Sequence, residues 1–150
     1  MCSYCGCQAI TVIGRFMAEH DDIVNALTRL RSSCAARDAD DVPEAVSVME
    51  HLLHPHTHAE EVGLFTTMRA DEEFADHIDT LCGEHTDLDA RLVRLRAGAY
   101  TEFEAFEHAL RNHIDKEDNG LFPAAAIALT GPDWEQVDAL TPPAHAAEVS

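Results

Sequence analysis

The sequence predicts an all-α fold, an up-down-up-down antiparallel four-helix bundle with a metal centre in its core. Three observations lead to this prediction. Four long segments repeat apolar residues at steps of three and four, which places those residues on one face of a helix. Each apolar face is interrupted by histidine or glutamate. The connections between the segments are short, and short connections between long amphipathic helices make consecutive helices antiparallel.

The helical segments follow one another along most of the chain. The first carries Phe16 and Leu27 on its apolar face, and the third carries Ile78 and Leu88. The second and fourth segments show the same spacing around their own histidines. The expected helices cover residues 9–36, 43–68, 71–97 and 101–129.

Residues at the segment ends agree with these boundaries. Gly98 follows the third segment, where a glycine commonly ends a helix. Thr101 and Glu104 have the spacing of a capping box at the start of the fourth segment, and Gly131 follows its end. Pro55 falls inside the second segment, and we expect it to kink that helix.

The chain divides into one helical domain and two flanking segments. Its 150 residues suit one domain with one core. We expect a cysteine-rich N-terminal segment (1–8), the bundle (9–131) and a C-terminal tail (132–150). In the tail, Trp134 is the one large residue able to anchor the segment to the bundle. We expect the rest of the tail to be a loosely held strap on the surface of the bundle.

The composition excludes several classes of function. The net charge of −18 repels phosphate backbones and anionic lipid surfaces, so we expect neither nucleic-acid nor membrane binding. No stretch is long and apolar enough to cross a bilayer, and the N-terminus lacks the pattern of a secretory signal. The expected location is therefore the cytoplasm. The sequence does not indicate an oligomeric state.

Polar residues lie in the middle of all four apolar faces. A buried histidine or carboxylate is costly unless it is paired or bound to a metal, so six such residues need a common explanation. A buried hydrogen-bonded network without metal is the alternative. The expected metal ligands are His20, His56, Glu60, His85, His113 and Glu117.

An internal repeat relates the two halves of the chain. Residues 56–65 and 113–122 share His, Glu, Gly, Leu and Phe at the same offsets, and His20 and His85 lie upstream of the two copies. Each half therefore reads as a helical hairpin that supplies one histidine and then a His-x-x-x-Glu pair. The repeat predicts a pseudo-two-fold bundle with a symmetric pair of metal positions.

The donor set indicates the kind of metal. His-x-x-x-Glu places both side chains on one face, one turn apart, where the carboxylate can bind one metal or bridge two. Four imidazoles and two carboxylates suit iron or manganese, and the absence of thiolate excludes a structural zinc or iron–sulfur site. Two metals would keep exchangeable positions for oxo, hydroxo, O2 or peroxide.

Other histidines offer rival assignments. His58 and Glu61 form a second possible pair in the second segment, and His54 with His58 forms a His-x-x-x-His pair. Both lie off the apolar face, and the repeat aligns His56 instead. His77 lies two turns before His85, where it could be a partner of that imidazole.

The role of the N-terminal cysteines stays open. Cys2, Cys5 and Cys7 could bind a metal, form a redox disulfide or relay thiols to the centre. Ordinary reduced thiols at a frayed terminus are the alternative.

The motifs together resemble the hemerythrin-like, His-His-Glu cation-binding family. They are Glu19-His20, Pro55-His56-Thr57 with Glu60-Glu61 and Gly63-Leu64-Phe65, Glu84-His85, and His113 with Glu117 and Gly120-Leu121-Phe122-Pro123. The resemblance implies an up-down bundle with a non-haem centre of two iron ions and an oxo or hydroxo bridge, with manganese or zinc as alternatives. It also implies O2, H2O2 or NO as the small-molecule ligand.

The sequence departs from the oxygen carriers of that family at two points. Those carriers have a second histidine four residues before the one matched by His85, and this position is Leu81. They also place an Asp five residues after the last His, so Asp118 competes with Glu117 as the ligand. An opened coordination position favours peroxide or nitric oxide chemistry, with a catalase- or peroxidase-like activity. Reversible O2 binding or sensing, and metal storage, are the alternatives.

Overall fold

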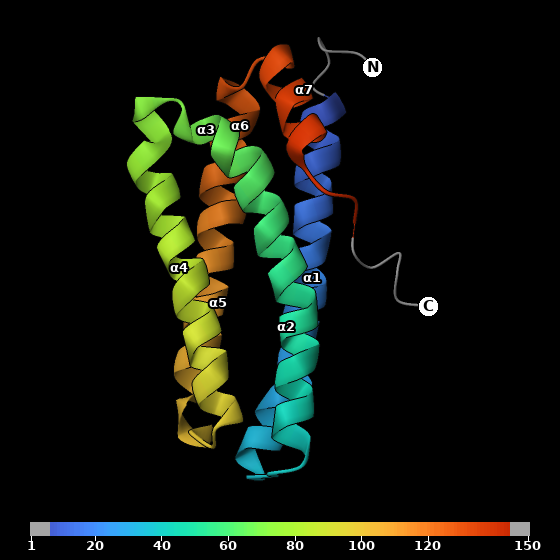
Figure 1. The fold of residues 1–150 in the computed structure, drawn as a ribbon, viewed down its shortest axis with the longest axis vertical. Helices are drawn as coiled ribbons and strands as arrows, with labels where there is room; N and C mark the ends of the chain where they lie inside the picture. The colour runs from blue at the N-terminus through green and yellow to red at the C-terminus, as the bar shows by residue number, and fades with distance from the viewer. Residues whose placement is uncertain (1–6, 145–150) are drawn as a thin grey trace.

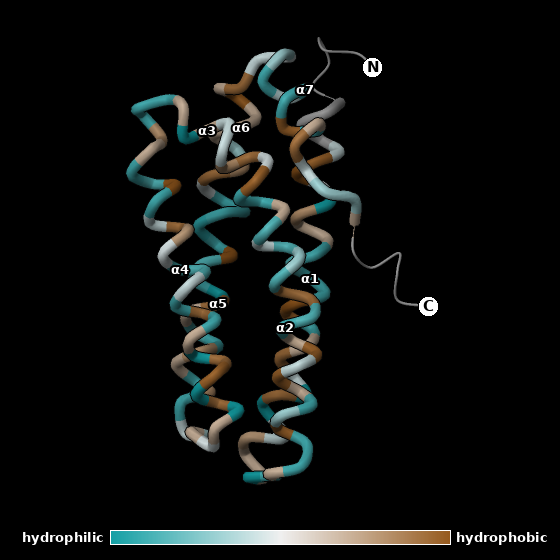
Figure 2. The backbone as a smooth tube through the Cα atoms, in the orientation of Figure 1, coloured by the Kyte–Doolittle hydropathy of each residue, from teal (hydrophilic) through white to brown (hydrophobic). Residues whose placement is uncertain are grey.

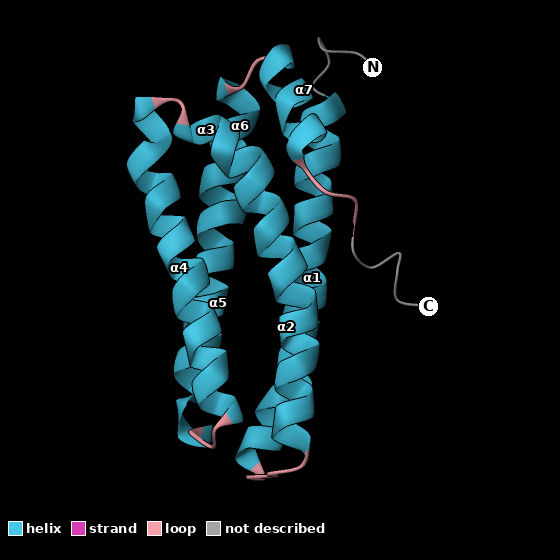
Figure 3. Ribbon diagram, in the orientation of Figure 1, coloured by secondary structure: helices cyan, strands magenta, loops and turns pink. Residues whose placement is uncertain are grey.

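The computed structural model describes residues 7–144, and these residues contain helices and no strand (Figure 3), which confirms the all-α prediction. Four long helices lie side by side along the long axis (Figure 1). They are α1 (Cys7–Ala35), α2 (Asp41–Glu60), α4 (Glu72–Arg96) and α5 (Phe103–Lys116). Helix α1 packs against α2 and α5, and α4 packs against the same two helices. The four helices therefore enclose a common core.

Shorter helices extend or connect the long ones. The π-helix η1 (Glu61–Phe65) and helix α3 (Thr66–Arg69) continue directly from α2. The π-helix η3 (Glu117–Leu121) and helix α6 (Phe122–Ala128) continue in the same way from α5. A 3-10 turn, η2 (Tyr100–Glu102), precedes α5, and α7 (Gly131–Leu140) follows α6. Helices α3, α6 and α7 lie together at one end of the molecule (Figure 1).

The core consists of two apolar clusters. One contains Ile23, Leu53, Leu88 and Leu110 among its buried side chains. The other lies toward α7 and contains Phe16, Phe65, Leu81 and Phe122 among others. The buried histidines and glutamates fall between these two sets along each helix, and hydrophobic and hydrophilic stretches alternate along every long helix (Figure 2). A polar layer therefore divides the apolar core.

The two π-helices differ from the sequence prediction, which treated each region as one uninterrupted α-helix. Both lie at the glutamate of a His-x-x-x-Glu pair. A π-helix has more residues per turn than an α-helix, so residues five positions apart return to the same face. Glu60 and Phe65 are both buried, as are Glu117 and Phe122. Apolar residues spaced at three and four positions predict a regular α-helix, so this spacing does not reveal the extra residue in the π-helical turn.

The helix ends confirm one prediction and correct another. Gly98 has a φ of 110°, a conformation that favours glycine, and it follows α4 as expected. The predicted capping box at Thr101 is wrong, because this residue lies in the 3-10 turn and α5 begins at Phe103 without a side-chain cap. A capping box is present instead at Thr130 and Asp133, where α7 begins.

The tail is more ordered than a loosely held strap as far as residue 144. Trp134 is buried, as expected of an anchor, but it belongs to α7, which the sequence analysis did not predict. Helix α7 packs against α1 and η1. Beyond it, the Arg15 guanidinium donates a hydrogen bond of 2.7 Å to the Pro142 carbonyl. The C-terminal segment therefore covers the apolar cluster that contains Phe16 and Phe65.

Two further expectations concern the ends of the chain and the membrane. The predictions for the cysteine side chains of segment 1–8 lie outside what the structure describes. Among the helices within residues 7–144, none combines the length and apolar character that a bilayer crossing requires.

The contact between η1 and α7 generates a testable prediction. A Cβ built on Gly63 would overlap Oγ1 of Thr141, which donates a hydrogen bond to the Val137 carbonyl. A Cβ on the aligned Gly120 meets nothing within 4 Å. Replacing a helical glycine by alanine normally stabilises by about 0.5–1 kcal/mol. We expect Gly120→Ala to raise the melting temperature and Gly63→Ala to cancel that gain or lower it. Equal increases in thermal unfolding would contradict the close packing.

Candidate metal centre

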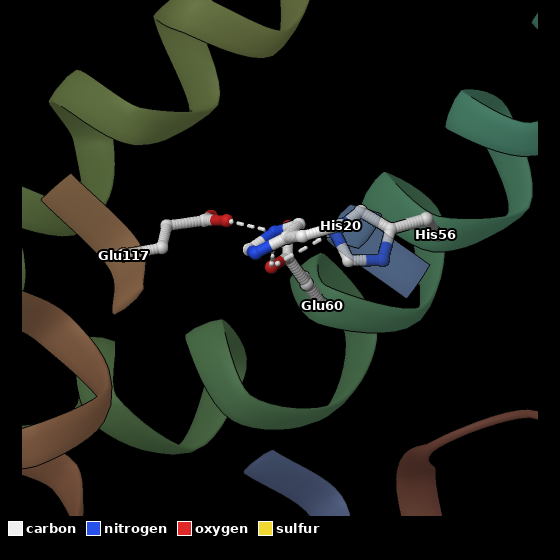
Figure 4. A group of neighbouring side chains, drawn as sticks. All are labelled: His20, His56, Glu60 and Glu117. Atoms are coloured by element: carbon white, nitrogen blue, oxygen red, sulfur yellow. Dashed lines mark hydrogen bonds and ion pairs between the residues drawn. The ribbon is translucent and has the colours of Figure 1, made fainter. Parts of the chain in front are cut away.

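The structure brings all six predicted residues into the buried polar layer. Two groups of donors form, each with its ligand atoms within 4.8 Å of one another. One contains His20 and His56, the other His85 and His113, and Glu60 and Glu117 belong to both. Figure 4 shows the first group, in which the imidazoles and carboxylates point toward one another. Each of the six side chains is at most 4% exposed.

The two glutamates lie between the histidine pairs. Glu60 Oε2 is 3.2 Å from His56 Nε2, and its Oε1 is 3.3 Å from His85 Nε2. Glu117 Oε1 is 3.0 Å from His20 Nε2, and its Oε2 is 3.2 Å from His113 Nε2. Each carboxylate thus directs one oxygen to each pair, an arrangement suited to bridging two cations.

An outer layer of carboxylates orients the four imidazoles. Each Nδ1 lies within 2.6–2.7 Å of a carboxylate oxygen that belongs to a neighbouring helix. Since a carboxylate accepts, Nδ1 carries the hydrogen, and each Nε2 faces the centre. The pairs are His20 with Asp118, His56 with Glu19, His85 with Glu61, and His113 with Glu84.

The outer layer obeys the same pseudo-two-fold relation as the repeat. Glu19 and Glu84 each precede an inner histidine and bind the imidazole of the same hairpin's other helix. Glu61 and Asp118 each follow an inner glutamate and bind the imidazole of the other hairpin. The sequence analysis did not assign this role. The recurrence of an acidic residue beside four of the six inner residues was the signal that could have found it.

The geometry also separates the rival assignments. Asp118 and Glu61 lie in the outer layer rather than among the inner donors. His58 is exposed on α2 and is absent from both donor groups. The Nδ1 partner of His85 is the Glu61 carboxylate, so the possible partner His77 is not the residue that orients this imidazole.

The electrostatics show that the layer attracts positive charge. Burial alone would lower the pKa of His56, but the charge of Glu60 and the hydrogen bond to Glu19 raise the pKa to about 10. Burial likewise opposes the contacts of His85 with Glu117 and Glu60, which raise its pKa to about 11. Burial would raise the pKa of Glu117, yet its contacts with the histidines, that with His113 the largest, hold it well below the usual value.

Unpartnered atoms in the same layer fit a bound cation. Among the side chains of residues 11–144, the buried nitrogen and oxygen atoms without a hydrogen-bond partner are His56 Nε2, both carboxylate oxygens of Glu60, and Glu117 Oε2. All four face the centre. His85 Nε2 and His113 Nε2 are 3.1 Å apart, so at most one hydrogen can lie between them. Buried groups of this kind are costly unless a proton or a metal satisfies them.

The net charge of the inner and outer layers also fits bound cations. The six carboxylates comprise two inner and four outer groups. Arg15 forms an ion pair with Glu19, and Lys116 forms one with Glu84. Six negative and two positive charges leave four negative charges, which two divalent cations would balance. The residues present therefore fit a pair of metal ions.

Aromatic rings close one side of the centre. Phe65 stacks on His85 with ring centroids 5.6 Å apart, and Phe122 stacks on His20 at 5.9 Å. Phe16 approaches His56 edge-on at 5.6 Å. Leu81, at the position where the oxygen carriers have a histidine, is fully buried in the same apolar cluster. This side of the centre is therefore dry and apolar.

The raised pKa values predict how the metal-free protein responds to pH. Each folded-state pKa lies above the ordinary value of 6.5, so this contribution to stability is complete below pH 6.5. It is lost as the pH rises through about 10 for His56 and about 11 for His85. We expect ring nitrogen NMR shifts to report protonated imidazoles at pH 8. Neutral rings at that pH would contradict the assigned environment.

Comparison with known proteins agrees with this geometry. The family described as Hemerythrin HHE cation binding domain matches residues 11–125, which include all six inner residues and all four outer carboxylates. No curated protein and no solved structure matches the chain. The match covers most of the chain and confirms the resemblance inferred from the motifs. The chain belongs to the hemerythrin HHE cation-binding domain family.

Proposed function

We propose that the four long helices form an up-down-up-down antiparallel bundle whose centre holds two iron ions that decompose hydrogen peroxide. The observation that carries the proposal is the inner layer itself, in which two glutamates face two pairs of histidines. Consecutive long helices have their connections at alternate ends in Figure 1, which supports the antiparallel course.

The donor set favours iron or manganese over structural zinc, and we propose iron. Imidazole and carboxylate together suit iron and manganese, whereas zinc in structural sites prefers four tetrahedral ligands with thiolate among them. Each position has two imidazoles and shares two carboxylates. Four donors leave an octahedral ion with room for a small ligand.

The protein's own residues perform three tasks at this centre. The inner histidines and glutamates hold the ions, and the outer carboxylates fix the imidazole rings so that each Nε2 faces inward. Phe16, Phe65 and Phe122 exclude bulk water from one side. The Glu61 carboxylate is 41% exposed and contacts His85 Nδ1, so this pair can exchange protons with solvent.

The proposed chemistry needs no external electron donor. When bound, the iron pair would supply the two-electron exchange by which one H2O2 is reduced to water and a second is oxidised to O2. The dry apolar side of the centre admits small neutral molecules more readily than ions. Nitric oxide and O2 share this property. Reversible O2 binding and iron storage are the outcomes that compete with peroxide decomposition.

Reconstitution with iron tests the proposal. We expect iron-loaded protein to contain two irons per chain and to evolve one O2 for every two H2O2 consumed, measured by mass spectrometry and an oxygen electrode. A stable O2-dependent spectrum without peroxide decay would favour reversible binding. Redox-inert metal would favour storage, and failure to bind any metal would overturn the proposal.

Removal of one inner imidazole should reduce iron binding and stability together. We expect His56→Ala and His113→Ala each to weaken iron binding by more than about tenfold, since even an outer-layer partner is worth 10–100-fold. The melting temperature of the iron-loaded protein should fall too, because metal binding is coupled to folding. His108→Ala, an exposed histidine on α5, is the matched control. Unchanged iron content in both inner variants would contradict the ligand assignment.

The leucine at position 81 provides a test of the open coordination position. Leu81 lies one helical turn before His85 and is fully buried. We expect Leu81→His to slow peroxide decay, because the added imidazole occupies a position that substrate needs. Leu81→Met, which adds no comparable donor, is the control. Equal rates of peroxide decay for wild type and Leu81→His, at equal iron content, would contradict the hypothesis that Leu81 leaves a coordination position open.

A further inference from the structure

A surface cavity opens on the His85 side of the buried centre. It has a volume of about 330 Å³ and lies between α2 and α4. Its wall includes His54 and His58 from α2, Glu61 from η1, and His85 and Asp89 from α4. The cavity therefore joins solvent to an imidazole of the inner layer.

The cavity contains side chains that bind divalent cations. His54 and His58 are both exposed and lie four residues apart on α2, a spacing that places two imidazoles on one face, although the ligand atoms in this wall do not lie as close together as those of the two buried groups. Asp89 Oδ1 is 3.0 Å from His54 Nε2, and its side chain is 48% exposed. Glu61 adds a second carboxylate. Two imidazoles and two carboxylates form a set of the same chemistry as the buried donors.

The pseudo-two-fold related face of the bundle lacks this set. The repeat aligns His54 with Arg111, which forms an ion pair with Glu107. It aligns His58 with Asp115, so no imidazole replaces either histidine. Asp89, four residues after His85, corresponds to Val24, four residues after His20. The two halves agree at every inner residue and differ here, so the imidazole pair is not a by-product of the repeat.

Glu61 connects the cavity to the centre. Its Oε2 lies 2.6 Å from His85 Nδ1, and its side chain is 41% exposed. The other three outer carboxylates are 22–25% exposed. Glu19 and Glu84 are also ion-paired with Arg15 and Lys116. Of the four, Glu61 is the carboxylate most accessible to an arriving cation.

We propose that His54, His58, Glu61 and Asp89 form a second, surface site for a divalent cation, from which the ion passes Glu61 to reach the buried centre. The net charge of −18 raises the local concentration of cations around such a site. The loading role rests on the proposed function, because it requires a centre that takes up metal. The surface site itself does not.

Calorimetric titration of the metal-free protein with Zn²⁺ tests the surface site. We expect wild type to bind one more ion per chain than the double variant His54→Gln/His58→Gln. Both histidines are exposed, so circular dichroism should show that the variant keeps its fold. His108→Gln, an exposed histidine that is not part of the cavity wall, should match wild type. Equal ion counts for wild type and the double variant would overturn the site.

The rate of filling tests the loading role. Rapid mixing of metal-free protein with Co²⁺, followed by visible absorption, reports occupation of the centre. We expect the double variant to fill at least about tenfold more slowly, since it lacks both imidazoles that hold the arriving ion beside Glu61, and to reach the same final absorption. An unchanged rate despite the lost surface ion would overturn the loading role.

These measurements separate the two proposals. If the centre takes up no metal but the surface site exists, wild type binds one Zn²⁺ that the double variant loses. That result supports the surface site and overturns the proposed function. If wild type and the double variant both bind two ions, the centre stands and the surface site fails.

Discussion

The hydrogen bond from each imidazole Nδ1 to an outer carboxylate is the interaction on which the rest of the structure depends. It decides which ring nitrogen carries hydrogen, and it turns each remaining Nε2 toward the centre. The same four bonds place four carboxylates around a layer that already contains two. The result is a negative charge inside an apolar core, which only protons or cations can compensate.

This layer constrains the fold as well as the chemistry. The buried polar residues divide the core into two apolar clusters, and the uncompensated negative charge of the polar layer lies between them. An inner residue and an outer residue are adjacent in sequence at four places, so each long helix, with its π-helical extension where it has one, supplies one or two groups to the centre and one to a neighbouring imidazole. Rotation of any one helix about its axis would break both contacts. The polar layer therefore sets the register in which the helices pack.

Much of this arrangement follows from sequence, and the exceptions have physical causes. The six inner residues were predictable because His20 and the others fall on apolar faces with helical spacing. The π-helices were not, since one extra residue per turn shifts Phe65 and Phe122 inward without altering composition. Glu19 and Glu84 lie beside the apolar face and resemble ordinary solvated acids. Helix α7 is short and begins with Gly131-Pro132, residues that read as a stop rather than a start.

The pseudo-two-fold pattern of the outer layer has a consequence for the origin of the fold. Each hairpin contains one complete set of inner and outer groups, and two of the four outer bonds cross between hairpins. One hairpin paired with an identical copy across a two-fold axis would therefore satisfy every contact of the centre. Joining two such halves in one chain leaves each half free to change alone. Phe16 corresponds to Leu81, and His54 corresponds to Arg111. A single chain can carry different residues at corresponding positions, whereas a symmetric dimer of identical copies cannot.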